Sequence, residues 1–253
     1  MMPTLKLIEK QIAMSDIARR LNEKRAALPP GRYVSANGVG FGPYVLISRE
    51  CGSGSSLMAE KIGKELGWNV FDSKIVDEIA KAGRVHQKLV QSVDEQVHSH
   101  WERTWRELLL DELTDKGYLH HLGQLVTALG HQGNVIIVGR GAQYMLPPQG
   151  ALRVRLVAPL DARIKRIAEL ENLSPEEARI KIKQVDSKRA AFLWKVFRKD
   201  AGLPLNHDLV LNTGDISIDS AARIVLAALE EKLGVSVQKQ PDILKEMHER
   251  IAA

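Results

Sequence analysis

The residues best suited to chemistry lie between 48 and 56, where a glycine-serine turn joins a short apolar run to a helical pattern. Gly52 and Gly54 let the backbone turn tightly and approach a ligand closely. The amides of such a turn, together with the N-terminus of the following helix, attract anions. Three small hydroxyl side chains complete the turn: Ser53, Ser55 and Ser56. The pattern is typical of a loop that binds phosphate groups, and the last hydroxyl is placed to reach a hydrated magnesium ion.

The match to the nucleotide-binding signature G-x-x-x-x-G-K-[ST] is incomplete. Arg49 takes the position of the first glycine, Ser55 that of the lysine, and Ser56 that of the magnesium-binding hydroxyl. The lysine that would meet the transferred phosphate is therefore missing. We expect Arg49, or an arginine farther along the chain, to replace it. A glycine-serine run of this kind is also common in plain loops, and both interpretations stay open.

Charged residues follow two of the predicted strands. Asp72 ends the run 68–72, and Arg140 comes directly after the apolar run 135–138. In parallel α/β sheets, ligands bind at the carboxyl ends of the strands, so both side chains are well placed for a ligand. Asp72 can equally cap a helix that begins near Ser73.

A second group of cationic residues lies between 161 and 199. Arg163 and Arg166 are three residues apart and therefore share one helical face. A longer stripe follows in steps of four, three and three: Arg179, Lys183, Asp186 and Arg189. A charged stripe is usually a solvated face, but phosphoryl transfer also needs clustered arginines to neutralise the transferring group.

Five short apolar runs alternate with helical patterns from residue 44 to residue 233: 44–48, 68–72, 135–138, 152–157 and 208–211. This alternation predicts a three-layer α/β/α domain with a mainly parallel five-stranded sheet. We expect this domain to span 43–235, with a helical insert at about 73–131 and a helical lid at about 160–200. Residues 1–42 are predicted to form an amphipathic helix over 4–28 and a linker, and 236–253 a helical tail.

The composition excludes several classes of protein. The chain has 253 residues, 36 basic against 31 acidic side chains, and a single cysteine, Cys51, which excludes an internal disulfide and a cysteine zinc site. Its apolar runs are too short to span a membrane, and we expect a cytoplasmic protein. Aromatic residues do not interleave with the basic ones, which argues against nucleic-acid binding. The helix over 4–28 fits either a surface helix or a homo-oligomer contact.

Taken together, the chain resembles the cytidylate kinase-like family of P-loop nucleoside-monophosphate kinases over about 44–233. The segments that carry the resemblance are 47–54, 71–72, 135–141, 157–167, 185–191 and 207–213. A lysine-free Ser-Arg-Glu-x-Gly-Ser-Gly loop is similar to the usual form in that family. The resemblance implies the P-loop nucleoside-monophosphate kinase fold.

It also implies transfer of the γ-phosphoryl group of ATP, with Mg²⁺, to a nucleoside monophosphate, most naturally CMP or dCMP. The donor phosphates would then be held by Arg49, Gly52, Ser53, Gly54, Ser55 and Ser56, with Ser56 toward the metal. The acceptor would be bound by Asp72, Arg140, Asp186 and Arg189. The residues expected to act in phosphoryl transfer are Arg140, Arg163, Arg166, Asp186 and Arg189.

Two positions depart from the pattern of cytidylate kinases. Gly141 stands where an aspartate follows the Gly-Arg pair, and Glu78 stands where an acceptor-binding arginine is expected. Two alternatives therefore stay open. The protein could be a catalytically weak or inactive nucleotide-binding regulator, or a kinase of another small-molecule acceptor.

Overall fold

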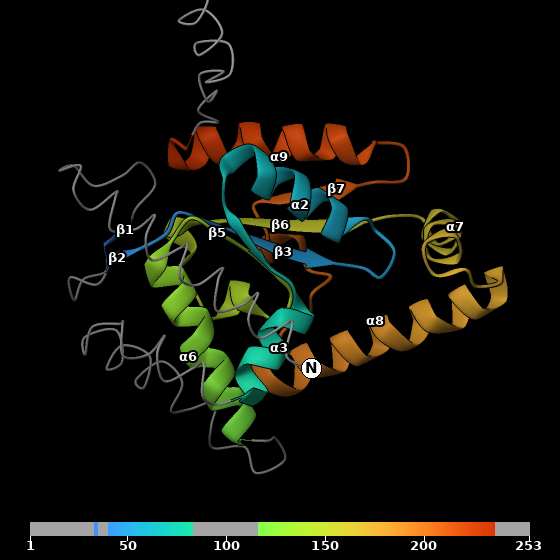
Figure 1. Ribbon diagram of the computed structural model, residues 1–253, viewed down its shortest axis with the longest axis horizontal. Helices are drawn as coiled ribbons and strands as arrows, with labels where there is room; N and C mark the ends of the chain where they lie inside the picture. The colour runs from blue at the N-terminus through green and yellow to red at the C-terminus, as the bar shows by residue number, and fades with distance from the viewer. Residues whose placement is uncertain (1–32, 35–39, 83–115, 236–253) are drawn as a thin grey trace, which may run out of the picture.

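The computed structural model of the chain describes residues 33–34, 40–82 and 116–235 (Figure 1). Its centre is a five-stranded sheet in the spatial order β4-β5-β3-β6-β7, in which every neighbouring pair is parallel. The strands are β3 (Tyr44–Arg49), β4 (Asn69–Phe71), β5 (Val135–Val138), β6 (Ala151–Val157) and β7 (Leu209–Asn212). All five predicted strands are present, and the sheet is wholly parallel rather than mainly so.

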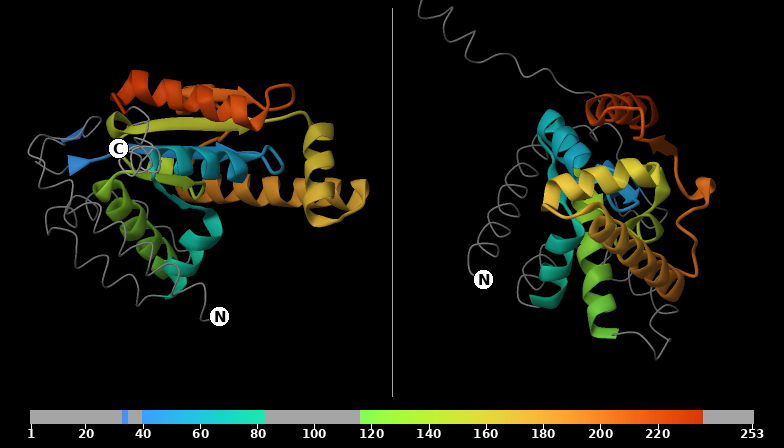
Figure 2. Two further views of the ribbon diagram at one scale, coloured as in Figure 1. Left: turned by 45° about the horizontal axis from the view of Figure 1, so that its top comes forward. Right: turned by 90° about the vertical axis from the view of Figure 1, so that its right-hand side faces the viewer.

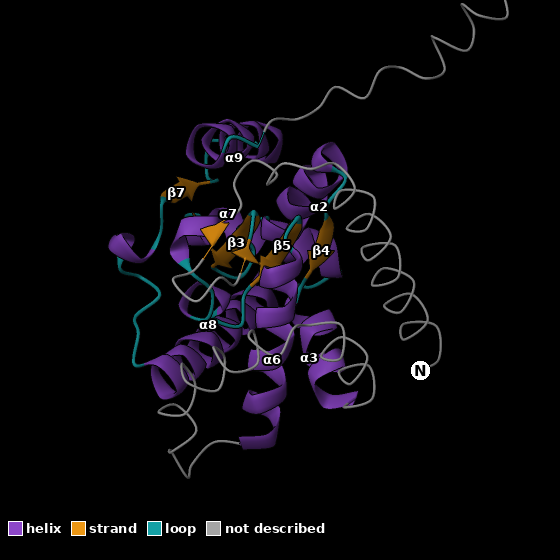
Figure 3. Cartoon of the chain, turned by 90° about the vertical axis from the view of Figure 1, so that its left-hand side faces the viewer, coloured by secondary structure: helices purple, strands orange, loops and turns teal. Residues whose placement is uncertain are grey.

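Helices cover both faces of the sheet (Figures 1 and 3). On one face lie α2 (Ser55–Leu66) and α9 (Ile218–Leu233), and on the other lie α3 (Ser73–Ala82), α6 (Lys116–Gln132) and α8 (Pro175–Phe197). A further helix, α7 (Leu160–Glu171), stands beyond the carboxyl ends of the strands, as Figure 2 shows from a second side. The predicted three-layer architecture is confirmed.

The central strands are mostly apolar because both of their faces are buried, and their polar residues are Ser48 and Arg49 of β3 and Arg153 and Arg155 of β6. Along β3, Tyr44 and Leu46 belong to the core under α6 and α8, whereas Val45 and Ile47 belong to the core under α2 and α9. All four side chains are at most 1% exposed. Successive side chains of a strand point to opposite faces, so one strand joins two separate cores.

Helices α7 and α8, the segment that the sequence predicts to be a lid and that is called the lid below, share a small core of their own. Helix α8 begins with a capping box, in which the Ser174 hydroxyl accepts from the amide of Glu177 at 3.3 Å. Ile164 and Ile167 of α7 pack against α8 and against Cys51 of the loop after β3. The lid therefore rests on the glycine-serine loop through apolar contacts as well as polar ones.

The segment before β3 differs from the linker that the sequence suggested. Here β1 (Tyr33–Val34) pairs antiparallel with β2 (Gly40–Phe41). Phe41 is 1% exposed and packs into the core that contains α6, since an aromatic side chain buries a large apolar area there. The predicted helix over 4–28, its oligomer contact and the tail 236–253 lie outside the described residues. Within the described part of the chain, the helices are too short or too polar to cross a bilayer.

Asp208 ties three elements together near the amino ends of β6 and β7, at the end of the sheet away from the loop. Its carboxylate accepts from the backbone amide of Arg153 at 2.8 Å, from the Arg153 guanidinium at 2.7 Å and from Lys232 Nζ at 2.7 Å. Burial alone would raise the pKa of Asp208, but the hydrogen bonds from Arg153 and Lys232 outweigh it and lower the pKa to about 2. This carboxylate therefore stabilises the fold in its charged form.

We predict that Asp208→Asn lowers the free energy of unfolding at pH 7 by about 1 kcal/mol, a value discounted for solvent screening. Because the folded-state pKa is depressed, the wild-type contribution is present above about pH 4, the pKa of an unfolded aspartate, and is lost as the pH falls toward 2. Urea unfolding at several pH values measures this difference. Equal stabilities at pH 7 would contradict the prediction.

Candidate functional site

The loop between β3 and α2 depends on two glycines with positive φ, +80° at Gly52 and +84° at Gly54. A Cβ at Gly52 would lie 2.8 Å from the carbonyl oxygen of Arg163, and one at Gly54 would lie 2.3 Å from Ile218 Cδ1. At Gly52 both the backbone conformation and the lack of space require glycine, and at Gly54 the backbone conformation does. The glycines let α7 and α9 pack directly against the loop.

Helix α2 begins without a side-chain cap, since its N-cap is Gly54. Helix α7 also lacks a side-chain cap, since its N-cap is Pro159. By contrast, Asp72 Oδ1 accepts from the amides of Lys74 and Ile75 on α3, and serines cap α8 and α9. First-turn amides without a cap need another acceptor, and an anion supplies one. The start of α2 therefore suits the phosphates of a nucleotide.

The three serines of the loop have different surroundings. Ser53 is fully buried, its hydroxyl donates to the carbonyl of Glu50 at 2.9 Å, and its own carbonyl accepts from the Thr213 hydroxyl at 2.8 Å. Ser53 thus stabilises the loop from within. Ser55 is buried and Ser56 is exposed at the start of α2. Of these hydroxyls, that of Ser56 is the one open to a ligand from solvent.

A magnesium ion fits this site only if substrate phosphates and water supply most of its ligands. Among residues 33–34, 40–82 and 116–235, histidine, cysteine, aspartate and glutamate side chains do not gather in groups of three or more. Mg²⁺ commonly keeps several waters and takes one or two protein oxygens together with substrate phosphates. The exposed Ser56 hydroxyl can be one such oxygen.

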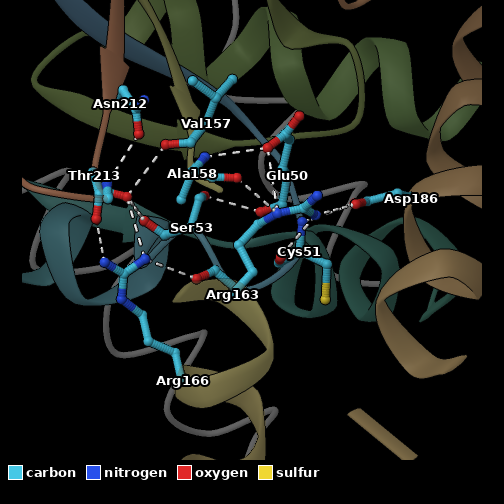
Figure 4. Close-up of polar contacts among 12 residues, drawn as sticks. Glu50, Cys51, Ser53, Val157, Ala158, Arg163, Arg166, Asp186, Asn212 and Thr213 are labelled. Carbon is cyan, nitrogen blue, oxygen red and sulfur yellow. Dashed lines mark hydrogen bonds and ion pairs between the residues drawn. The ribbon is translucent and has the colours of Figure 1, made fainter. Parts of the chain in front are cut away.

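Two arginines of α7 hold the loop by its carbonyl groups (Figure 4). Arg163 donates to the carbonyl of Ala158 at 3.0 Å and to that of Cys51 at 3.3 Å. Arg166 donates to the carbonyl of Gly52 at 3.1 Å and also contacts Thr213. The two residues do share one helical face, as their spacing predicted, but that face is turned to the loop's own backbone.

Asp186 of α8 binds the loop from the other helix, and together with Arg163 and Arg166 it forms what we call the clamp. One carboxylate oxygen accepts from the amide of Cys51 at 2.8 Å, and the other accepts from Arg163 Nη1 at 2.7 Å. Glu50 lies 3.5 Å from the same guanidinium. Burial raises the pKa of the Cys51 thiol, which keeps this side chain neutral inside the lid's small core. The loop, α7 and α8 therefore form one interlocked unit.

A pocket of about 490 Å³ opens on the other side of this unit, between the ends of β3, β5 and β6 and the helix α8. Its size is within the range usual for small-molecule sites. Five cationic side chains line it: Arg49, Arg140, Arg155, Lys188 and Arg189. Three carboxylates also line it: Glu50, Asp186 and Asp200. Two of those three, Glu50 and Asp186, already face Arg163.

The pocket therefore carries an excess of positive charge. Arg140 forms an ion pair with Asp77 and lies 5.7 Å from the ring centre of Phe192. Arg189 Nη1 is 3.6 Å from Asp186, and burial lowers the pKa of its guanidinium. Burial, followed by the charges of Arg189 and Arg140, lowers the pKa of Arg49 to about 9. An anionic ligand would relieve this repulsion.

The structure thus brings Arg49, Arg140, Asp186 and Arg189 together, as the sequence analysis expected of the last three. Asp72 is not among the residues that line the pocket, because it caps α3 as its alternative interpretation held. Arg163 and Arg166 do not line the pocket either; they bind the loop.

Arg155 and Lys188 are pocket residues that the sequence analysis did not identify. Arg155 lies opposite Ser48 in the register of β6 and β3 and donates to its hydroxyl at 3.0 Å. The available signal was the second of two cations in a strand that is otherwise apolar, at the position nearer its carboxyl end. A charged side chain in a buried strand is more often directed to a ligand site than into the hydrophobic core, since burying an unpaired charge is costly.

We predict that Arg163→Lys lowers the free energy of unfolding by about 1–3 kcal/mol. A lysine keeps the charge but lacks the planar fork that contacts Ala158, Cys51 and Asp186 together. Urea denaturation measures the change, and Arg179→Lys, at an exposed position of α8, serves as the matched control. Equal losses in both variants would show that the clamp adds nothing.

The geometry agrees with three comparisons. The cytidylate kinase-like family matches residues 44–215 of this chain. The chain is 30% identical over 173 residues to a cytidylate kinase of Ignicoccus hospitalis, an alignment that covers 67% of this chain and 88% of that protein. It is 26% identical over 187 residues to a cytidylate kinase of Pyrococcus horikoshii, covering 74% and 88%.

Among solved structures, an uncharacterized protein from Eubacterium ventriosum is similar, with a TM-score of 0.61 and 19% identity over 74% of this chain and 98% of that one. That similarity concerns the fold alone. The family match spans more than half of the chain and includes the loop, the pocket arginines and both lid helices. The chain therefore belongs to the cytidylate kinase-like family.

Proposed function

We propose that this protein transfers the γ-phosphoryl group of ATP to a nucleoside monophosphate, with CMP and dCMP as the leading acceptors. The observation that carries the proposal is the single segment 48–56, which borders the uncapped start of α2 on one side and the cationic pocket on the other. Two anion sites that share one loop suit a donor and an acceptor phosphate. The relatives named cytidylate kinase support this choice of acceptor.

On the donor side, the amides at the start of α2 bind the phosphates of ATP, and Gly52 and Gly54 allow their close approach. The Ser56 hydroxyl is the protein group that would hold Mg²⁺. When bound, this ion neutralises charge on the donor phosphates. Arg163 and Arg166 keep the loop in the shape that presents its amides, because they bind its outward carbonyls.

On the acceptor side, Arg140 and Arg189 bind the phosphate of the nucleoside monophosphate with planar, two-pronged guanidinium groups. An oxygen of that phosphate attacks the γ-phosphorus of ATP, a new P–O bond forms, and the bond to the β-phosphate oxygen breaks, so that ADP leaves. Helices α7 and α8 cover the strand ends and keep out water, which would otherwise accept the phosphoryl group.

One observation favours a different acceptor as the second candidate. A Cβ at Gly141 would lie 2.3 Å from the ring of Phe197, and the residue has a φ of +70°. The aspartate that cytidylate kinases carry at this position therefore has no space here. An acceptor whose recognition does not need that carboxylate, such as another small phosphorylated molecule, would then be preferred over CMP.

The proposal is tested by measuring ADP formation from ATP and Mg²⁺ against a panel of nucleoside monophosphates. We expect turnover with CMP or dCMP, and a fall in kcat/KM of roughly 10²-fold in Arg189→Gln, since a charged donor to the transferring group is lost. Arg223→Gln is the matched control, because Arg223 is exposed on α9, donates to the Ser220 hydroxyl and does not line the pocket.

Two results would contradict the proposal in different ways. Binding of ATP without turnover on any nucleotide would favour the second candidate or a non-catalytic regulator. Failure to bind ATP at all would show that the loop is structural, and the proposed function would fall with it.

A further inference from the structure

Arg49 occupies an unusual position for a residue at the start of a phosphate-binding loop. It is the last residue of β3, and its Nη2 donates to the Ser73 hydroxyl at the start of α3 at 3.0 Å. Its other terminal nitrogen lies over Gly139, at the end of the neighbouring strand β5: a Cβ there would be 1.7 Å from Nη1. The side chain thus extends away from α2 and across the end of β5.

Gly139 makes this path possible. Its φ of +89° and its missing side chain leave the space that the guanidinium fills. The residue that follows is Arg140, so the end of β5 brings two guanidinium groups to the same wall of the pocket. The position of Arg49 is therefore built by two strands and one helix, not by the mobility of a long side chain.

The charges around Arg49 are mostly of its own sign. Arg140 and Arg189 are the positive neighbours whose charge acts against its protonated form, whereas Asp72 acts in favour of it. Asp72 Oδ1 is already held by two amides of α3, and Arg49 forms no ion pair within 4.0 Å in the described part of the chain. Its one hydrogen bond there is to the neutral Ser73.

Arg49 and Arg140 at the strand ends and Arg189 on α8 all line this pocket, and their charges repel one another unless an anion lies between them. In the described part of the chain, Arg140 pairs with Asp77 and Arg189 with Asp186, whereas Arg49 forms no ion pair. A phosphate dianion has enough oxygens to accept from all three at once. We propose that Arg49 binds the acceptor phosphate together with Arg140 and Arg189, and does not stand in for the missing lysine at the ATP phosphates. The inference rests on the proposed function and assigns Arg49 to the acceptor half of that same site.

The test separates the two substrates by equilibrium binding. Calorimetry measures Kd for Mg·ATP, for CMP, and for inorganic phosphate with the loop already filled by a non-hydrolysable ATP analogue and Mg²⁺. The variants are Arg49→Gln and Arg49→Lys, with Arg223→Gln as the control. The Arg49→Lys variant keeps the positive charge, so it tests the assignment even if Arg49→Gln fails to fold. It lacks the planar guanidinium fork that would bind the phosphate.

We expect both Arg49 variants to raise Kd for CMP and for phosphate by roughly 10- to 100-fold, and to leave Kd for Mg·ATP within about twofold. Weaker binding of Mg·ATP with unchanged phosphate binding would overturn the inference and return Arg49 to the donor side. Unchanged binding of all three probes would overturn it as well.

Failure of the inference and failure of the proposed function give different results. If wild type binds phosphate but not CMP, and the Arg49 variants lose phosphate, the assignment of Arg49 holds while CMP fails as the acceptor. If wild type phosphorylates CMP and the Arg49 variants bind CMP normally, the proposed function holds and the assignment fails. If wild type binds neither phosphate nor CMP in the pocket, the assignment also fails.

Discussion

The site depends on the contact between the loop after β3 and the two helices of the lid. Arg163 and Asp186 bind the carbonyl and the amide of the same residue, Cys51, from α7 and from α8. Gly52 allows the backbone of α7 to reach the loop. Because both backbone amides and backbone carbonyls of the loop are hydrogen-bonded, the loop keeps its shape before any ligand arrives. Such pre-organised groups are the main source of electrostatic stabilisation in enzyme sites. The clamp therefore determines both the open amides of α2 and the outline of the pocket.

Much of the fold could be predicted from the sequence. Continuous apolar runs identify strands buried on both faces, as the alternation of Tyr44 and Leu46 with Val45 and Ile47 illustrates. The pattern Ser174-Pro175-Glu176-Glu177 predicts the start of α8, since a capping box satisfies backbone donors within four residues. Local signals of this kind act over short distances, and a single sequence contains them in full. The pairing of β1 with β2 gave no such signal.

The candidate site was only partly predictable, because side-chain direction depends on distant residues. Arg49 extends toward α3 only because Gly139, on another strand, has no side chain. Ser53 has the same chemistry as Ser56, yet its hydroxyl points inward because the carbonyl of Glu50 accepts it. The spacing of Arg163 and Arg166 predicts a shared face but not what that face contacts. The sequence shows which residues are cationic and how they are spaced. Only the tertiary structure shows which of them belong to the clamp and which line the pocket.

The contact between Gly141 and Phe197 also constrains how the family can diverge. The ring of Phe197 fills the volume that any side chain at position 141 would need. A side chain at position 141 therefore needs both a smaller residue at 197 and a change in the left-handed backbone of 141. A chain with an aspartate at the first position should carry a smaller residue at the second.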